Sequence, residues 1–392
     1  MEPQVRLGVA HLSKLAYSGI DLNTVQMECL TQMLSGNNTS AALMDLSIIA
    51  QIHGDPDLGL EFQDKALETH RAFATRRRHD KQPKLLVFAE PKVMGGNTPV
   101  EFLLETSDFE VVTFYQLQNS TAADLPKHDL AFCAASTESP TAETFFAKVR
   151  ELTKDTSAKV LNLPETLVKP ERDALQRLFP DVPGLRTAKT ALLSRAELLD
   201  GVDPIPGQIG AYPNIIRPEG SHAGVGLVKL SSSDDLATYL AQRTEDTFFV
   251  SEFMNYADPK DGLFRKQRVV LINGQAFPAH MAVADHWDVW YMNAGMDKSA
   301  AKRAEEQAFM DDFDSFRIRH KDALAALNSA FDLEYFGIDC AEDRDGNLVV
   351  FEVDNALIVH NMEPEAIYPY KGPHMMKLFK AFEDMLLQSL PG

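Results

Sequence analysis

Apolar residues recur at helical spacing in the first fifth of the chain. Between residues 21 and 79 this pattern predicts a helix through Ala41–Ala50, a break at Gly54-Asp55-Pro56 and a second helix from Asp57 to Phe73. One helical pair cannot bury both of its apolar faces alone. We therefore expect residues 1–80 to form a helical segment that packs on the domain that follows.

The periodicity changes at residue 84, where short apolar runs begin to alternate with helical segments. This alternation is typical of a small parallel α/β unit, which we assign to residues 81–165. Asn97 or Thr98 is expected to cap a short helix that has Pro99 at its first position. The predicted strands are 85–89, 110–115, 128–134 and 159–162.

From residue 166 to the end the pattern is mixed and indicates an α+β region of two lobes, with a hinge near 250–256. Helices are predicted at 170–179, 297–331 and 374–387, and glycine-containing strand pairs lie between them. The expected fold class is therefore α/β followed by α+β, with an N-terminal helical segment.

Three carboxylates lie on two strand-like runs near the C-terminus. The runs flank Asp345-Gly346, a strong hairpin signal, and a two-residue turn there would place Asp339 opposite Glu352. Asp354 would share the face of Glu352. Like charges in an apolar sheet need neutralisation, and all-oxygen ligands favour Mg²⁺ or Mn²⁺ over zinc. The alternative is an exposed hairpin edge with solvated acids, but the flanking apolar residues favour burial.

A glycine-rich loop between two strands supplies a candidate phosphate site. Arg217 ends the first strand, and the loop contains Ser221, His222, Gly224 and Gly226. Glycines let backbone amides approach phosphate oxygens closely. The loop is not a Walker A motif, and a plain glycine hairpin is the alternative.

Two further strands carry candidate site residues. The apolar run 247–254 ends in Glu252, Phe253 and Met254, and suits an inter-lobe hinge whose backbone could bind an adenine edge. In the next strand, Lys266 and Arg268 share one face, where cations could meet a phosphoryl group or a substrate carboxylate. A cationic edge strand is the alternative. Among the histidines, His280 is the strongest candidate for acid–base chemistry.

Composition narrows the choice of partners. The 392 residues are 45% hydrophobic and 24% charged, with 57 acidic and 38 basic side chains and a net charge of −19. This balance argues against nucleic acid or an anionic membrane as partner. No signal peptide or membrane span is predicted, and three widely separated cysteines fit a reducing compartment, so we expect a cytoplasmic protein.

In this order, these segments resemble the ATP-grasp superfamily, in the branch of glutathione synthetase and the ribosomal-protein glutamate ligase. The resemblance covers about residues 84–390, and the N-terminal helices resemble a degenerate tetratricopeptide hairpin. It implies a pre-grasp α/β domain at 81–165 and an ATP-grasp domain of two α+β lobes at 166–392. It also implies ATP as cofactor, with Mg²⁺, or Mn²⁺, on Asp339, Glu352 and Asp354.

The resemblance assigns further roles and shows two departures. Lys189 matches a nucleotide-binding lysine, and Arg268 matches the arginine that faces the acyl phosphate. Arg217-Pro218 stands where the family has Lys-Pro, which keeps the charge and changes its geometry. Asp354 stands where the family has Asn and adds a negative charge.

The implied activity is an ATP-dependent ligation of a carboxylic acid to an amine through an acyl phosphate, which releases ADP and phosphate. The alternatives are a small-molecule kinase of the same fold and a nucleotide-binding protein without turnover. The sequence identifies neither substrate. It leaves open a homodimer and a peptide or protein partner bound through the N-terminal helices.

Overall fold

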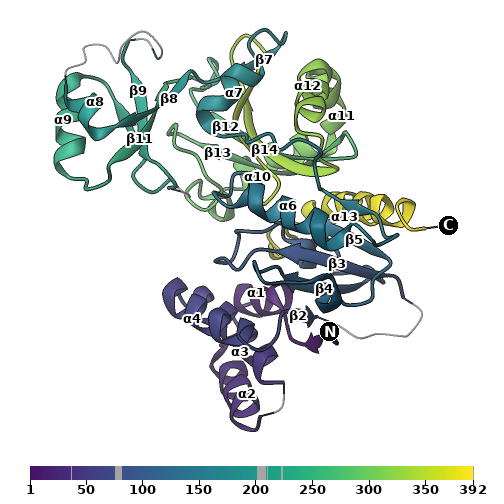
Figure 1. Ribbon diagram of the computed structural model, residues 1–392. Coiled ribbons are helices and arrows are strands. Elements are labelled where there is room, and N and C mark those ends of the chain that lie inside the picture. The colour runs from purple at the N-terminus through teal and green to yellow at the C-terminus, as the bar shows by residue number, and fades with distance from the viewer. Residues whose placement is uncertain (37, 76–81, 201–208, 210, 222–223, 392) are drawn as a thin grey trace.

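The computed structural model describes residues 1–36, 38–75, 82–200, 209, 211–221 and 224–391. Within them three sheets carry helices on their faces, so the mixed α/β and α+β class is as predicted (Figure 1). No described helix has the length and apolar character needed to cross a membrane. Cys29, Cys133 and Cys340 are buried and free.

The first sheet has six strands in the order β1-β2-β4-β3-β5-β6, and the neighbouring pairs among β3 to β6 are all parallel. The strands are β1 (Gln4–Val5), β2 (Ala72–Ala74), β3 (Lys84–Ala89), β4 (Glu110–Tyr115), β5 (Leu130–Cys133) and β6 (Val160–Leu161). The helices before and between them are α1 (Val9–Tyr17), α2 (Asn23–Leu34), α3 (Thr39–Ile52), α4 (Pro56–Leu67), α5 (Val100–Leu103) and α6 (Ala142–Thr153). A 3₁₀ turn spans Ala122–Asp124.

This sheet includes part of the N-terminal segment, which the sequence pattern did not suggest. The helix predicted to run to Phe73 ends at Leu67, and Phe73 lies on β2, which pairs with β1 on one side and β4 on the other. The helix prediction was wrong at this end because Ala72–Ala74 is buried throughout and has no polar face from which a helix could be told from a strand. The boundary near residue 80 therefore does not separate two sheets.

The expected cap of the short helix at 100–103 is also wrong. Pro99 holds the N-cap position itself, without a side-chain cap. The Thr98 hydroxyl instead donates to the Asn355 carbonyl at 2.7 Å. The Asn97 side chain accepts from the Glu90 amide at 2.9 Å and donates to the Glu90 carbonyl at 3.0 Å. Thr98 therefore stabilises a long-range contact and Asn97 a local loop, and neither side chain caps the helix.

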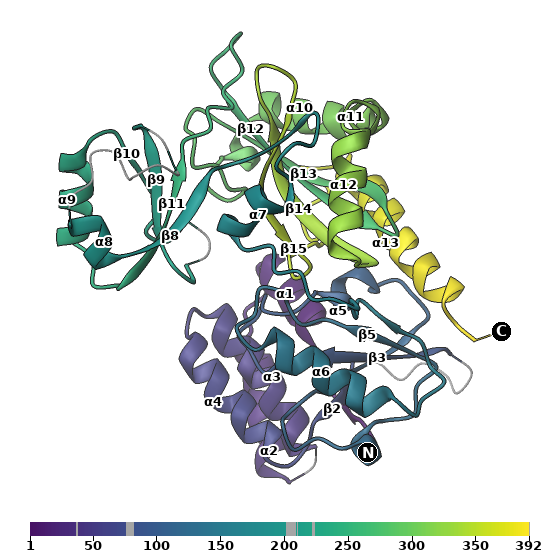
Figure 2. The same ribbon diagram turned by 45° about the horizontal axis from the view of Figure 1, so that its top comes forward.

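The second sheet is antiparallel and forms a small lobe in the order β10-β9-β11-β8. Helices α8 and α9 pack beside it, and the lobe lies at the side of the molecule in Figures 1 and 2. Its elements are β8 (Thr190–Ser194), α8 (Arg195–Leu199), β9 (Asn214–Pro218), β10 (Val228–Leu230), α9 (Ser233–Ala241) and β11 (Thr247–Glu252).

The third sheet has five strands in the order β13-β12-β14-β15-β7. Its strands are β7 (Leu185–Thr187), β12 (Phe264–Ile272), β13 (Gln275–Ala284), β14 (Tyr335–Glu342) and β15 (Leu348–Asp354). The associated helices are α7 (Arg172–Leu178), α10 (Ala300–Asp311), α11 (Phe313–Arg319), α12 (Lys321–Phe331) and α13 (Lys371–Gln388), with a 3₁₀ turn at Met296–Lys298. The long helical segment predicted at 297–331 is thus helical but divided.

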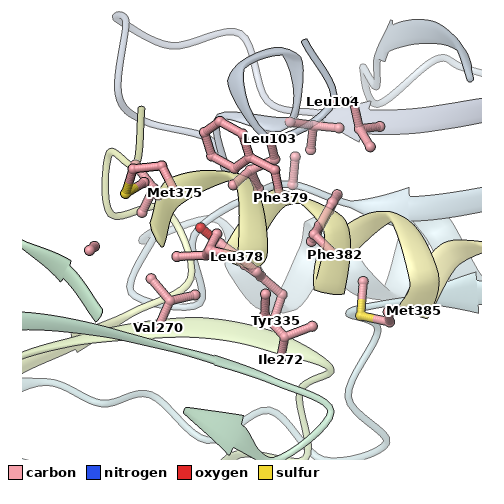
Figure 3. Close-up of a cluster of buried hydrophobic side chains, with 14 of the residues drawn as sticks. Leu103, Leu104, Val270, Ile272, Tyr335, Met375, Leu378, Phe379, Phe382 and Met385 are labelled. Carbon is pink, nitrogen blue, oxygen red and sulfur yellow. The ribbon is translucent and has the colours of Figure 1, made fainter. Parts of the chain in front are cut away.

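Helix α13 packs between the first and third sheets. Figure 3 shows Leu378, Phe379 and Phe382 between Leu103 and Leu104 of the α5 region and Val270, Ile272 and Tyr335 of the third sheet. The Phe382 ring centroid lies 5.6 Å from that of Phe132 on β5 and 5.3 Å from that of Tyr335 on β14. One apolar core therefore fixes the α/β unit against the strands that carry the candidate site.

Candidate active site

Four polar side chains form one row across the third sheet. His280 pairs with Arg268, Arg268 with Asp339, and Asp339 with Glu352, on strands β13, β12, β14 and β15. Residues that lie directly opposite on neighbouring strands project from the same face. The predicted register of Asp339 opposite Glu352 is therefore confirmed, and two further strands extend the row.

The register is right although the predicted turn is wrong. The turn is longer than two residues: the Gly346 amide donates to the Asp343 carbonyl, and the Asp343 amide to the Asn347 carbonyl. This shifts the pairing by one residue. A bulge then leaves Phe351 without a partner, because Cys340 pairs with Val350 while Asp339 pairs with Glu352.

Asp339 is held by two cations from β12. Arg268 donates from Nε and Nη2 to the two carboxylate oxygens at 2.8 and 3.1 Å, and Lys266 Nζ lies 2.9 Å from Oδ2. Burial alone would raise the pKa of Asp339, but Arg268 and Lys266 hold it well below its usual range. The predicted shared face of Lys266 and Arg268 is present, and it is directed to Asp339.

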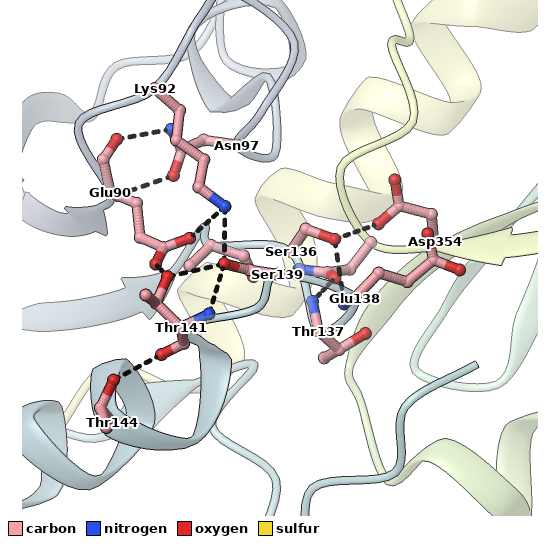
Figure 4. Close-up of polar contacts among 12 residues, drawn as sticks. Glu90, Lys92, Asn97, Ser136, Thr137, Glu138, Ser139, Thr141, Thr144 and Asp354 are labelled. Atoms are coloured by element: carbon pink, nitrogen blue, oxygen red, sulfur yellow. Dashed lines mark hydrogen bonds and ion pairs between the residues drawn. The ribbon is translucent and has the colours of Figure 1, made fainter. Parts of the chain in front are cut away.

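The other two predicted metal ligands have different partners. Glu352 accepts from Arg172 of α7 at 2.8 Å. Asp354 accepts from Ser136 Oγ at 3.0 Å and from the Ala356 amide at 2.9 Å (Figure 4). Within the described residues no three His, Cys, Asp or Glu side chains are placed to hold a metal ion. Guanidinium and ammonium groups pair with two of the three carboxylates, Asp339 and Glu352, and the expected metal site on Asp339, Glu352 and Asp354 stays a prediction.

A fourth carboxyl group, that of Glu138, reaches this region from the loop after β5. Burial, together with Asp354 and Glu352, raises the pKa of Glu138 to about 8. Burial and Glu352 raise the pKa of Asp354 to about 6, against hydrogen bonds that lower it. Negative charge on Glu138 and Asp354 is thus incompletely neutralised. An oxygen-ligated divalent cation suits that deficit chemically, although the side chains are not arranged as its ligands.

The small lobe directs Arg217 toward the same region. Burial and the nearby Arg172 lower the pKa of Arg217 to about 10, while Glu352 and Glu138 oppose the shift. Arg217 Nε donates to Ser221 Oγ at 3.0 Å. The predicted phosphate loop and the carboxylates therefore lie within electrostatic range of each other.

Glycine is required in this loop. Gly224 and Gly226 have φ of 74° and 67°, and a Cβ on Gly226 would lie 2.7 Å from Pro218 Cδ. The Gly226 carbonyl accepts from the Tyr239 hydroxyl at 2.7 Å. His222, predicted as a binding residue here, lies outside the described residues.

The predicted hinge joins the small lobe to the third sheet. Lys189 and Glu252 are neighbours, since the Lys189 amide donates to Glu252 Oε1 at 3.1 Å and the Glu252 amide to the Lys189 carbonyl at 2.9 Å. Met254 is buried against residues of β14 and β15. Phe253 lies under Lys229, whose Nζ is 3.5 Å from the ring centroid.

His280 and the two β12 cations line a cavity of about 240 Å³ on the third sheet. Burial and the neighbouring Arg268 lower the pKa of His280 well below its usual value, so the ring is neutral at pH 7. Its ring centroid lies 4.8 Å from that of Tyr291. A neutral imidazole here suits hydrogen bonding to a ligand better than charge neutralisation.

Several residues of this region were not found from the sequence. Arg172, Lys229 and Glu138 each lie in segments whose local pattern is unremarkable, and their roles arise from contacts across more than 20 positions. Only their charge within otherwise apolar or helical surroundings could have singled them out. Without the tertiary pairing, that signal is too common to select them.

Neither the scan of protein-family models nor the search of curated proteins gave a match. Among solved structures, the fold is similar to the VanG D-Ala:D-Ser ligase from Enterococcus faecalis, at 14% identity over 78% of this chain and 100% of that one, with a TM-score of 0.47. It is also similar to a D-alanine–D-alanine ligase from Bacillus anthracis complexed with ATP, at 13% identity over 78% and 96%, with a TM-score of 0.45. A RimK domain ATP-grasp protein from Sphaerobacter thermophilus matches at 14% identity over 78% and 99%, with a TM-score of 0.44.

Proposed function

We propose that this chain is an ATP-dependent ligase that joins a carboxylic acid to an amine through an acyl phosphate, with release of ADP and phosphate. The observation that carries the proposal is the row His280, Arg268, Asp339 and Glu352. Its first three residues line a cavity, and Glu352 lies within electrostatic range of Arg217, on the strand that leads into the glycine loop of the small lobe. Such a row supports one site in which an acid and a nucleotide phosphate could meet.

The nucleotide is assigned to the side of the row that faces the small lobe. Arg217, Ser221, Gly224 and Gly226 would contact phosphates, and positive φ at both glycines supports close approach of backbone amides. Lys189 and the backbone from Glu252 to Met254 would contact the base and its neighbouring phosphates. His222 belongs to this proposal by sequence alone.

Magnesium, or manganese, is proposed on Asp339, Glu352 and Asp354 together with phosphate oxygens. The raised pKa values of Asp354 and Glu138 support a need for positive charge here. When bound, the ion would offset phosphate charge and polarise the transferring group. Forming this site requires the carboxylates to exchange part of their ion pairs with Arg268, Lys266 and Arg172 for the metal.

The reaction proceeds in two displacements. A carboxylate oxygen attacks the γ-phosphorus, and the bond to the β–γ bridging oxygen breaks to give acyl phosphate and ADP. The amine nitrogen then attacks the acyl carbon, the carbon–oxygen bond to phosphate breaks, and the amine proton leaves to solvent or phosphate. Arg268 and Lys266 would orient the carboxylate and offset the charge of the transferring phosphoryl group, and no nucleophilic side chain is required.

Hydroxylamine tests this route without knowledge of the natural amine. The full chain is incubated with Mg-ATP, hydroxylamine and a panel of small carboxylic acids, and hydroxamate and ADP are measured. We expect both to form in equal amounts with at least one acid. With an ¹⁸O-labelled carboxylate, one label should appear in the released phosphate.

Arg268→Gln should lower kcat by about 100-fold, because a charged donor to the transferring group is lost. Arg265→Gln is the matched control, since Arg265 lies on the same strand but on the other face, paired with Asp261 and Glu305. It should retain activity within about twofold.

The hydroxylamine assay also separates the alternatives. ADP formed without hydroxamate, or phosphate released without the label, would favour a kinase. ATP binding without ADP formation would favour a nucleotide-binding protein without turnover.

A further inference from the structure

A buried carboxylate lies behind the cavity of the candidate site. Glu306, on α10, is fully buried and does not line the cavity. The groups in contact with its two oxygens are the Met281 amide, the hydroxyls of Tyr291 and Tyr370, and the ammonium group of Lys371. The proposed reaction assigns no step to Glu306. A buried charge is costly unless it is well paired, so its presence here needs a separate explanation.

Each oxygen of Glu306 contacts two of these groups. Oε1 lies 3.0 Å from the Met281 amide nitrogen and 3.3 Å from Lys371 Nζ. Oε2 lies 2.6 Å from the Tyr370 hydroxyl and 3.0 Å from the Tyr291 hydroxyl. Burial and Glu306 raise the pKa of both tyrosines, so both hydroxyls are protonated and donate. The carboxylate is therefore surrounded by donors on both oxygens.

The first link runs to the loop that joins β13 to α10, residues 285–299. Tyr291 of this loop lines the cavity, and its ring centroid lies 4.8 Å from that of His280. Lys302 and Arg303 of α10 donate to backbone carbonyls near the end of the loop at 2.7 to 2.8 Å. The bond between Tyr291 and Glu306 extends this attachment to α10 into the middle of the loop.

The second link runs to the segment that leads into α13. Lys371 Nζ, beside Glu306, also donates to Glu363 Oε1 at 2.8 Å and to the Tyr291 hydroxyl at 2.7 Å. Glu363 lines the cavity. Burial would raise the pKa of Glu363, but His360 and Lys371 hold it well below its usual range. One ammonium group is thus shared by a carboxylate behind the cavity and a carboxylate that lines it.

The third link runs to β13. This strand is the outer one of its sheet, and Glu306 supplies an acceptor for the Met281 amide on the open edge. Met281 directly follows His280, which lines the cavity. Burial, Arg268 and Lys371 lower the pKa of His280, so the ammonium group beside Glu306 also acts on this ring. Glu306 therefore connects three segments that form the cavity.

We propose that Glu306 is a positioning residue of the candidate substrate cavity. It fixes Tyr291, Glu363 and the strand of His280 relative to one another, and thereby sets how tightly the acid binds. The inference rests on the proposed function for the role of the cavity. A carboxylate suits this task because its two oxygens can hold donors from three segments at once, whereas an apolar side chain holds none.

Glu306→Gln keeps the size of the side chain and removes one of its two acceptors. Glutamine has one oxygen and one amide group that only donates, so either the two tyrosine hydroxyls or the Met281 amide and Lys371 face a donor. Lys371 remains paired with Glu363, so no buried ammonium group loses its last carboxylate. We expect a folded protein in which the wall of the cavity is looser.

Tryptophan fluorescence reports on this wall without any ligand. The chain has two tryptophans, Trp287 and Trp290, and both lie in the 285–299 loop. In the full-length protein, acrylamide should quench this fluorescence about twofold more efficiently in Glu306→Gln than in the wild type, because the loop opens more often. Tyr291→Phe removes only the hydroxyl at the other end of the bond and should have the same effect.

Glu305→Gln is the matched control. Glu305 is the neighbour of Glu306 on α10, but its carboxylate pairs with Arg265 at 2.7 Å and is 36% exposed. Quenching in this variant should equal that of the wild type. If Glu306→Gln does not fold, Tyr291→Phe tests the same link from the side of the loop.

Steady-state kinetics distinguish positioning from a role in the chemistry. The hydroxylamine assay is run at saturating Mg-ATP with the acid of the panel that gives the highest wild-type rate. Glu306→Gln should raise KM for this acid about tenfold and leave kcat within about threefold, because the fit of the bound acid changes and the reacting groups do not. The double variant with Tyr291→Phe should be no worse than the weaker-binding single variant, since both changes break one link.

The proposal is overturned if quenching is unchanged in both Glu306→Gln and Tyr291→Phe, or if Glu305→Gln changes it equally. A constant KM for the acid, or effects that add in the double variant, would also overturn it. Absence of hydroxamate with every acid would instead count against the proposed function, and the quenching measurements would still decide whether Glu306 holds the loop.

Discussion

Two carboxyl groups of the candidate site show opposite responses to similar burial. Asp339 has Arg268 and Lys266 within ion-pair distance, and its pKa is held well below the usual range. Glu138 has mainly other carboxylates around it, and burial with Asp354 and Glu352 raises its pKa to about 8. The difference depends on which charges surround each group and not on depth of burial.

Glu138 should therefore make folding less favourable as pH rises. The unfolded chain loses this proton near pH 4.5 and the folded chain near pH 8, so the folded state binds more protons between those values. Its free energy of unfolding should fall across that window by about 1–3 kcal/mol more than that of Glu138→Gln. Urea unfolding at pH 5 and pH 8.5 without divalent cations measures this. Parallel pH profiles for the two proteins would contradict the assignment.

At the scale of single elements, the hairpin of β14 and β15, which carries Asp339 and Glu352, shows which features could be predicted from the sequence and which could not. The alternation of β14 and β15 and the pairing of Asp339 with Glu352 could be predicted, because both depend on neighbouring positions. The longer turn and the bulge at Phe351 could not be predicted. Each shifts the strand pairing by one residue, in opposite directions, so the predicted pairing of Asp339 with Glu352 was still correct. The pairing of β12 with β14, which gives Asp339 its cations, joins residues 71 positions apart and leaves no local pattern.

The glycine loop offers a matched test of element geometry. Gly226→Ala combines a positive φ with a Cβ contact of 2.7 Å to Pro218, whereas Gly224→Ala has the positive φ and open space. We expect a cost of about 1 kcal/mol for Gly224→Ala and about 2–4 kcal/mol for Gly226→Ala. Thermal unfolding and hydrogen exchange of β9 and β10 would measure both. Equal costs would mean that the contact with Pro218 is relaxed.

At the scale of the whole molecule, α13 couples the α/β unit to the third sheet. A final helix at 374–387 was predicted, and α13 spans Lys371–Gln388. Its apolar face predicts burial, but not that Phe382 contacts both Phe132 and Tyr335. The cavity wall formed by Glu363 and His360 directly precedes this helix, so its packing also positions the candidate site.

Phe382→Ala should destabilise both units together. Phe382 is fully buried, and its loss should cost about 3–5 kcal/mol, with a single unfolding transition retained at a lower temperature. Leu387→Ala is the control, because Leu387 is 43% exposed, and should change stability by less than about 0.5 kcal/mol. Calorimetry distinguishes the outcomes. Two separate transitions in Phe382→Ala would show that α13 is the main link between the units.

Strand β2 lies between β1 and β4, although the chain enters it only after four helices. Removing residues 1–75 would expose the edge of β4 that β2 covers at Val112, Thr113 and Phe114, all three of which are buried. An open apolar edge of this kind invites pairing with other chains. A truncated protein should therefore aggregate, so loss of activity on truncation would report on solubility, and the contribution of the N-terminal segment has to be measured with single substitutions.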